Sequence, residues 1–281
     1  IRVSSVTKED LLFYKKNGCT SMKFGIESGS QTMLDVMEKK FTVDDIKKAL
    51  FACHDIGLNS PPLGFMLGMP GESLKTAKES GKLMGEIAAH LRIPVGLIFK
   101  HNDLLYTIPL IGTPMYEYGK QLGLIGQSTD EEEKFLEITS NVGAFKRYYI
   151  NFNGAPMSEV VFWDMLVFLE ATKTYEKLIK NKTENEELKK KYMNQNKAQA
   201  LNPHVKAKQN KVRKIEVMGA VTEINVPISQ YFVTNFVKEH IVFNRIIAKL
   251  PRFLVYPIVR YALYFEYLIQ KKLSNFKKIN Q

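Results

Sequence analysis

Three short polar turns hold residue types that could bind a small ligand, and each one follows an apolar run. The first is Glu27-Ser28-Gly29. A glutamate at the end of a strand can accept hydrogen bonds from a ribose diol or an ammonium group, and the small residues beside it let backbone approach a ligand closely. The same residues also fit an ordinary turn in which Glu27 caps the next helix, so both interpretations stay open.

The second turn is Gly-Met-Pro-Gly-Glu at residues 68–72. Gly68 allows close backbone packing, and Gly71 can take a positive φ. Glu72 stands where it could cap the helix that follows. Taken alone, the segment fits a tight turn between a strand and a helix better than it fits a binding site.

The third turn is Gly-Thr-Pro at residues 112–114. Thr113 fits the N-cap of a helix and Pro114 its first position, which makes a good helix start without any function. No phosphate-binding glycine loop occurs in the sequence, and its five histidines have no metal-ligand spacing. No Ser-His-Asp or Cys-His arrangement indicates nucleophilic catalysis.

The two cysteines, Cys19 and Cys53, are 34 residues apart. They form neither a disulfide framework nor a C-x-x-C metal motif, and we expect Cys53 to be a buried apolar side chain within a helix. Unpaired thiols are typical of a reducing compartment, so we expect a cytoplasmic protein. No signal-peptide pattern is visible. The start at Ile1 instead of Met suggests a chain cut from a longer protein.

Alternating helix and strand patterns over residues 1–128 must position these turns. Equivalent points of the strands recur about every 35–40 residues. Units of that length build a parallel sheet or a β/α barrel, whose working groups lie at the C-terminal ends of the strands. All three turns follow strands, which makes them site candidates. Helices are expected over 7–17, 42–56 and 73–89, and strands over 21–26, 63–67 and a third region covering 95–99 and 104–108.

Basic residues are concentrated in the second part of the chain. The net charge is +11, yet residues 1–170 hold 18 Lys and Arg against 21 Asp and Glu, while residues 171–281 hold 22 against 8. This asymmetry indicates a catalytic or binding core with an accessory region rather than a uniformly basic nucleic-acid binder. We expect a helical extension over 129–172, a basic polar linker over 173–228 and a basic aromatic helical tail over 229–281.

The tail is dense in aromatic residues and holds 9 Lys and Arg against 2 Asp and Glu. Its best apolar run, residues 253–269, is too short for a membrane span and is interrupted by Pro257, Arg260 and Glu266. We expect the helical pattern over 229–270 to be interrupted by Pro251 and Pro257. An interfacial helix on an anionic membrane surface and a helical domain packed against the core both stay open. No nucleic-acid-binding motif accompanies the charge, so no nucleic-acid partner is expected.

Taken together and in this order, the three turns resemble the second half of the radical S-adenosylmethionine (SAM) core domain. The similar segments are NGCTSMKFGIESGS at 17–30, FMLGMPGES at 65–73 and PLIGTPMY at 109–116, which resemble the fourth, fifth and sixth barrel strands with their turns. The resemblance covers roughly residues 1–128. By pattern it is nearest to the subgroup that often carries a cobalamin-binding domain ahead of the radical core.

The resemblance implies an α/β fold, namely half of a partial β/α (TIM-like) barrel with parallel strands, and the sequence pattern adds a mainly α-helical C-terminal region. It implies reductive cleavage of SAM at a 4Fe–4S cluster, an external electron donor, and radical chemistry on an unknown small-molecule or lipid-like substrate. Cobalamin is a further cofactor of the subgroup. The cluster is held by a C-x-x-x-C-x-x-C run that this sequence lacks, so its ligands are expected upstream of Ile1. We expect this chain alone to be inactive.

The resemblance also implies which residues bind the cofactor. Glu27 and Ser28, beside Gly29, match positions that contact the SAM ribose or amino group, and the strand end from Phe65 to Gly68 matches one that passes beside the adenine. No catalytic residue or metal ligand is assigned. The alternative is a non-catalytic β/α scaffold whose basic tail docks on a membrane surface or a partner, which would make the protein peripheral at the membrane. The predicted cofactor-binding residues are Glu27, Ser28, Gly29, Phe65, Gly68 and Thr113.

Overall fold

The computed structural model describes most of the first 179 residues and the C-terminal helix. The described residues are 1–60, 65–93, 95, 104–140, 149–179, 212–217, 220–225, 247 and 250–279. Within 137–140, 212–217, 220–225 and 270–279 the description covers the backbone alone. The expected strand residues 63–64 and 96–99, and most of the expected linker and the start of the tail, lie outside the described residues.

The helices of the first part begin at the residues that the sequence indicates. Thr7 and Thr42 each cap a helix through a capping box with an aspartate three residues later, and Ser73 does so with Thr76. Such caps satisfy backbone N–H groups that have no partner within the helix. Gly18 and Gly57, with φ of 90° and 71°, follow two of the helix ends. The elements are η1 (Val3–Ser5), α1 (Lys8–Lys16), α2 (Gln31–Val36), α3 (Val43–Asp55) and α4 (Leu74–His90).

Three extended segments run parallel to one another. Strand β1 (Met66–Leu67) pairs in parallel with β2 (Leu105–Tyr106). On the other side, two isolated parallel bridges join Ser21 to Asn59 and Glu27 to Phe65. The expected parallel arrangement is therefore confirmed for these segments, within a mainly helical structure in which a closed barrel half is not shown.

The segment at 21–26, expected as a strand, carries only the bridges at its two ends. The residues between the two bridge partners Asn59 and Phe65 include 61–64, which lie outside the described residues. The third expected strand region is realised in part by β2, and the Val95 position is described as helical.

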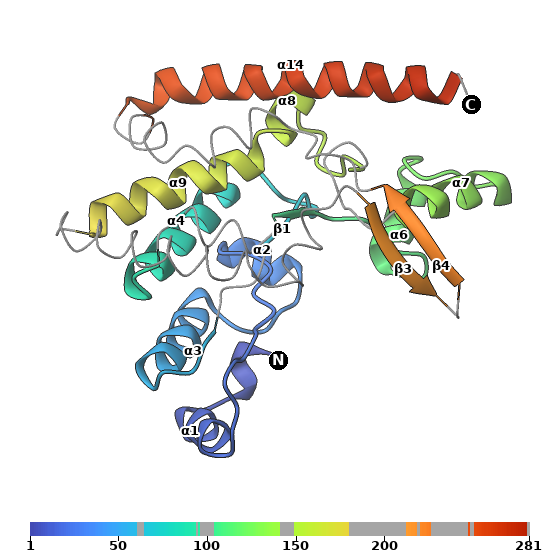
Figure 1. Ribbon diagram of the computed structural model, residues 1–281. Helices are drawn as coiled ribbons and strands as arrows, with labels where there is room; N and C mark the ends of the chain where they lie inside the picture. The colour runs from blue at the N-terminus through green and yellow to red at the C-terminus, as the bar shows by residue number, and fades with distance from the viewer. Residues whose placement is uncertain are drawn as a thin grey trace.

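Helices α4 and α9 (Trp163–Leu178) form the main packed layer of the protein (Figure 1). Gly81 and Gly85 on α4 make this approach close, because a Cβ at either position would lie 2.5 Å from a backbone carbonyl of α9. Cys53 is fully buried in the same core, as expected. The core therefore lies between the parallel segments and the α4–α9 layer.

Residues 104–179 add further helices beside this layer. They are α6 (Pro114–Gln121), α7 (Thr129–Ser140) and α8 (Met157–Val160), ahead of α9, which continues past residue 172 to Leu178. Strands β3 (Val212–Val217) and β4 (Ala220–Asn225) form an antiparallel pair. This pair lies within the segment expected as a polar linker, where no strand was predicted.

Helix α14 (Arg252–Ile279) lies along one side of the molecule as a single long element (Figure 1). It begins directly after Pro251, as expected, but it continues through Pro257, so the expected interruption there is wrong. A proline in a helix leaves the carbonyl four residues earlier without its donor. That residue is Phe253, and both it and Pro257 are exposed, so water can supply the missing hydrogen bond. None of the described helices has the length and apolar content that a membrane crossing needs.

Candidate functional site

Glu27 lies at an edge where parallel segments end. Its carbonyl accepts a hydrogen bond from the Met66 amide at 2.7 Å, next to its bridge with Phe65. Its φ of 66° is unusual for a residue with a side chain. The carboxylate is partly exposed, and its Oε1 lies 3.4 Å from the Lys39 ammonium. A ligand with hydrogen-bond donors can therefore reach a carboxylate that the backbone holds in one place.

Ser28 and Gly29 pack against helix α4. The Ser28 side chain is buried, and its hydroxyl lies 3.2 Å from that of Ser80. The Gly29 amide donates to the same Ser80 hydroxyl at 3.0 Å, and a Cβ at position 29 would lie 2.6 Å from the Ser80 Cα. Glycine is required here because α4 approaches so closely. Ser28 and Gly29 therefore position the turn, whereas Glu27 provides the carboxylate that a ligand can reach.

The turn after β1 is fixed by two side chains from a distant loop, Tyr149 and Asn153. The Tyr149 hydroxyl donates to the Gly68 carbonyl at 2.7 Å. The Asn153 side chain accepts from the Gly71 amide at 2.6 Å and donates to the Met69 carbonyl at 3.0 Å. Gly68 has a φ of 86°, and a Cβ there would lie 2.3 Å from the Tyr149 ring. The close packing expected at Gly68 is confirmed, and an aromatic ring is its cause.

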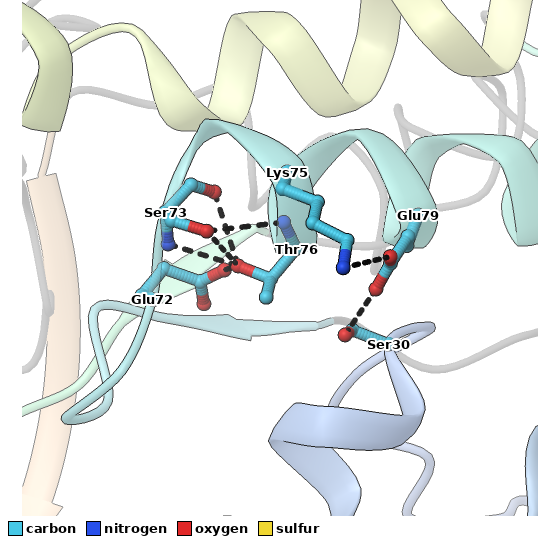
Figure 2. Close-up of polar contacts among 6 residues, drawn as sticks. All are labelled: Ser30, Glu72, Ser73, Lys75, Thr76 and Glu79. Atoms are coloured by element: carbon cyan, nitrogen blue, oxygen red, sulfur yellow. Dashed lines mark hydrogen bonds and ion pairs between the residues drawn. The ribbon is translucent and has the colours of Figure 1, made fainter.

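Glu72 is a buried carboxyl at the start of α4 (Figure 2). Its Oε1 accepts a hydrogen bond from the Thr76 hydroxyl, while Oε2 is buried without a partner among the described residues. Burial raises the pKa of Glu72 to about 7, although hydrogen bonds from Thr76 and from the backbone of Gly68 and Ser73 oppose this shift. The helix cap itself is Ser73. Glu72 can therefore hold or release a proton close to neutral pH.

Ser30 connects the first turn to the same helix. Figure 2 shows Ser30, the residue before α2, opposite Glu79 on α4. The Ser30 hydroxyl donates to Glu79 Oε2 at 2.5 Å, and the Lys75 ammonium lies 4.0 Å from Glu79 Oε1. Together with the contact between Ser28 and Ser80, this hydrogen bond ties the turn after Glu27 to the first half of α4. The turn after β1 leads into the same helix, so two turns that are far apart in sequence share one support.

Thr113 caps helix α6. Its hydroxyl donates to the Leu110 carbonyl at 2.6 Å and accepts from the Tyr116 amide at 3.3 Å, and Pro114 is the first helical residue. Among the described residues, no hydrogen bond or ion pair joins Thr113 to the turns at Glu27 and Gly68. The structure therefore explains Thr113 as the start of a helix, while a parallel bridge joins Glu27 to Phe65.

The residues that hold the two turns in place were not predicted from the sequence. Ser80 lies 52 residues from its partner Ser28, and Asn153 lies 84 residues from its partner Met69. No local spacing can reveal contacts over such distances.

A comparison with family models identifies the region that holds this edge. Residues 1–84 match the radical SAM superfamily. The matched residues include Glu27, Ser28, Gly29, Phe65 and Gly68, and they end before Thr113. They make up less than a third of the 281 residues. A comparison with curated proteins finds no match. The family match suggests SAM-dependent radical chemistry.

The residues at this edge fit one part of that chemistry. SAM offers a ribose diol and an ammonium group, both hydrogen-bond donors, and the Glu27 carboxylate can accept from either. A 4Fe–4S cluster with an open iron needs three thiolates. Cys53 is fully buried, and among the described residues no group of three or more His, Cys, Asp or Glu lies together. The Glu27 carboxylate can thus accept hydrogen bonds of the kind that SAM donates, whereas the two cysteines of the sequence are too few for three thiolate ligands.

Proposed function

We propose that this chain forms the SAM-binding side of a radical SAM enzyme. The observation that carries the proposal is that the family match at 1–84 covers the same residues whose backbone pairing brings Glu27 next to Phe65. When bound together, SAM and a reduced 4Fe–4S cluster supply a 5′-deoxyadenosyl radical, and the protein supplies binding and orientation.

In this proposal Glu27 accepts hydrogen bonds from the ribose diol or the amino group of SAM. The backbone from Phe65 to Gly68 passes beside the adenine, and Tyr149 and Asn153 hold that backbone still. Ser28 and Gly29 act as positioning residues, because they fix the turn against α4. Thr113 contributes by starting α6.

We further propose that the cluster ligands belong to a part of the protein outside this sequence. The two cysteines present are 34 residues apart and cannot form a C-x-x-x-C-x-x-C run. The same part would complete the β/α barrel, of which residues 1–128 would be one half. A cobalamin domain, if the protein has one, would also lie there. The segments 129–172, 173–228 and 229–281 would be accessory regions around this half barrel.

A second candidate function is a non-catalytic β/α scaffold. The observation that favours it is the lack of a cluster motif within this sequence, together with the packing role that the structure gives to Ser28, Gly29 and Thr113. The Glu27 edge would then be a remnant of a binding site. A small-molecule or lipid-like substrate belongs to the enzyme candidate alone.

Anaerobic reconstitution with iron and sulfide separates the two candidates. This chain alone should show no cluster absorption band, because it lacks three suitably spaced thiolates. A longer protein that carries a C-x-x-x-C-x-x-C run ahead of Ile1 should show the cluster absorption band. It should also form 5′-deoxyadenosine from SAM. A cluster band in this chain alone would contradict the ligand assignment. If the longer protein lacks the run, or forms the cluster without cleaving SAM, the scaffold function is favoured.

A further inference from the structure

The outer face of α14 carries an apolar stripe that no described part of the chain covers. The inner face, with Val255, Val259 and Leu263, is buried against the rest of the protein, where α14 packs on α8. On the opposite face, apolar side chains recur at helical spacing over four turns. They are exposed by 48%, 68%, 63%, 66% and 44% at Leu254, Ile258, Tyr261, Phe265 and Ile269.

This stripe differs from scattered surface hydrophobic residues. Single exposed apolar side chains are normal, but a contiguous apolar patch usually marks an interaction site. Figure 1 shows that α14 lies at the outside of the molecule, away from α1 and α3, so its outer face points away from the core. Because one face of α14 is apolar and exposed while the opposite face is buried, the stripe suits an element that lies in an interface plane.

Cationic groups flank the stripe. A groove of about 260 Å³ runs beside α14, and its lining includes Lys78, Arg260, Tyr256 and Tyr261. The Lys78 ammonium lies 5.6 Å from the Tyr256 ring centroid, and the Arg260 guanidinium donates to the Ser158 hydroxyl. Among the described residues, neither cation has a carboxylate partner. The groove therefore offers two positive charges above apolar walls, which fits a phosphate attached to a hydrophobic chain.

Basic residues outnumber acidic ones in α14 by six to one. Its basic residues are Arg252, Arg260, Lys271, Lys272, Lys277 and Lys278, and its one acidic residue is Glu266. A second copy of this chain docked through the same stripe would bring these positive charges together with a single acid on each side. An anionic lipid surface attracts them instead, and such attraction acts on each basic residue near the surface.

We propose that α14 docks this protein on a membrane surface rich in anionic phospholipid. The stripe from Leu254 to Ile269 lies in the headgroup region, and the groove with Lys78 and Arg260 holds the phosphate of one lipid. This docking does not depend on SAM chemistry, since it uses none of the residues at the Glu27 edge.

Vesicle flotation tests the proposal directly. The 281-residue chain should float with vesicles of phosphatidylcholine and phosphatidylglycerol, and it should not float with phosphatidylcholine alone. Combining Ile258→Ser with Phe265→Ser should lower the bound fraction at least about 10-fold, because the apolar anchor is lost. Lys78→Gln with Arg260→Gln should lower it about fivefold per charge. Added salt should weaken binding of the parent chain.

Phe13→Ser is the matched control, because Phe13 is 64% exposed on α1 and Phe265 is 66% exposed on α14. It should leave binding unchanged, and circular dichroism should show that all variants keep their helix content. Equal binding to both vesicle types, or unchanged binding of the double serine variant, would overturn the proposal. A dimer in sedimentation equilibrium that the serine pair abolishes, without any vesicle binding, would assign the stripe to a second copy of the chain.

Discussion

Glu27 and Glu72 are two glutamates that the fold treats in opposite ways. Glu27 is partly exposed, lies beside the Lys39 ammonium, and has a backbone conformation that is uncommon outside glycine. Glu72 is 4% exposed and keeps one oxygen without a partner among the described residues. A charged, reachable carboxylate suits ligand binding, whereas a buried one suits storage of a proton. The two residues therefore make separate predictions.

We expect Glu72→Gln to flatten the pH dependence of stability. The pKa of Glu72 is about 7 in the folded protein against an ordinary value of 4.5. Because the folded-state pKa is raised, the stability that Glu72 contributes is fully present below its unfolded-state pKa. That contribution is lost as the pH rises through the folded-state pKa. The loss approaches roughly 3 kcal/mol at most. Glutamine stays neutral, so the variant should be more stable than the parent above neutral pH. Urea unfolding of parent and variant, from below pH 4.5 to above pH 7, measures the free energy of unfolding at each pH. Parallel pH profiles of the two proteins would contradict the prediction.

Gly68→Ala should destabilise the protein more than Gly18→Ala. Both glycines have a positive φ, of 86° and 90°, so both substitutions strain the backbone by about 1–2 kcal/mol. A Cβ at position 68 also meets the Tyr149 ring at 2.3 Å, whereas at position 18 no described atom lies within 4 Å. The clash should add about 1–3 kcal/mol. Urea unfolding of both variants gives the difference, and equal losses would show that the ring moves aside freely.

At the scale of elements, the contact between α4 and α9 is the one that supports the site. Gly81 and Gly85 let the α9 backbone approach, since a Cβ at either position would lie 2.5 Å from a carbonyl oxygen of α9. The same helix α4 carries Ser80 and Glu79, which hold the turn after Glu27. A change in the spacing of α4 and α9 should therefore displace the turn after Glu27 at the candidate site.

Gly85→Ala should cost about 1–3 kcal/mol through overpacking against α9. Helix propensity alone predicts the reverse, because alanine favours a helix over glycine by about 1 kcal/mol. The sign of the effect thus separates packing from propensity. Lys82→Ala, at an exposed position of the same helix, is the control and should change stability little. Thermal unfolding of both variants decides, and a stabilised Gly85→Ala variant would refute the close packing.

The sequence predicted elements well where their signals are local. Helices were expected to start at Thr7 and Thr42, and Thr113 was expected to fit an N-cap. Each of the three caps a helix, because a cap depends on residues within one turn. The predicted interruption at Pro257 was wrong, because Phe253 and Pro257 are exposed and water can satisfy the Phe253 carbonyl. The sequence also could not separate a strand from isolated bridges at 21–26, because that depends on donors from another segment.

At the scale of the molecule, the order of turns along the chain predicted more than any single turn did. It indicated radical SAM chemistry, and residues 1–84 match that superfamily. The order could not show that Ser28 and Gly29 face α4 while Glu27 stays accessible, because Ser80 lies 52 residues from Ser28. It also could not find Tyr149 and Asn153, which hold the turn after β1 from a distant loop.

The central claim is that the Glu27 edge binds SAM, and equilibrium binding of SAM to the full protein loaded with its cluster tests it most directly. Glu27→Gln should weaken SAM binding roughly 10- to 100-fold, the usual effect of losing a hydrogen bond to a charged group. Glu38→Gln is the control, since Glu38 also has a positive φ but is exposed outside the edge. It should bind SAM as the parent does. Unchanged SAM affinity in the Glu27→Gln variant would contradict the claim.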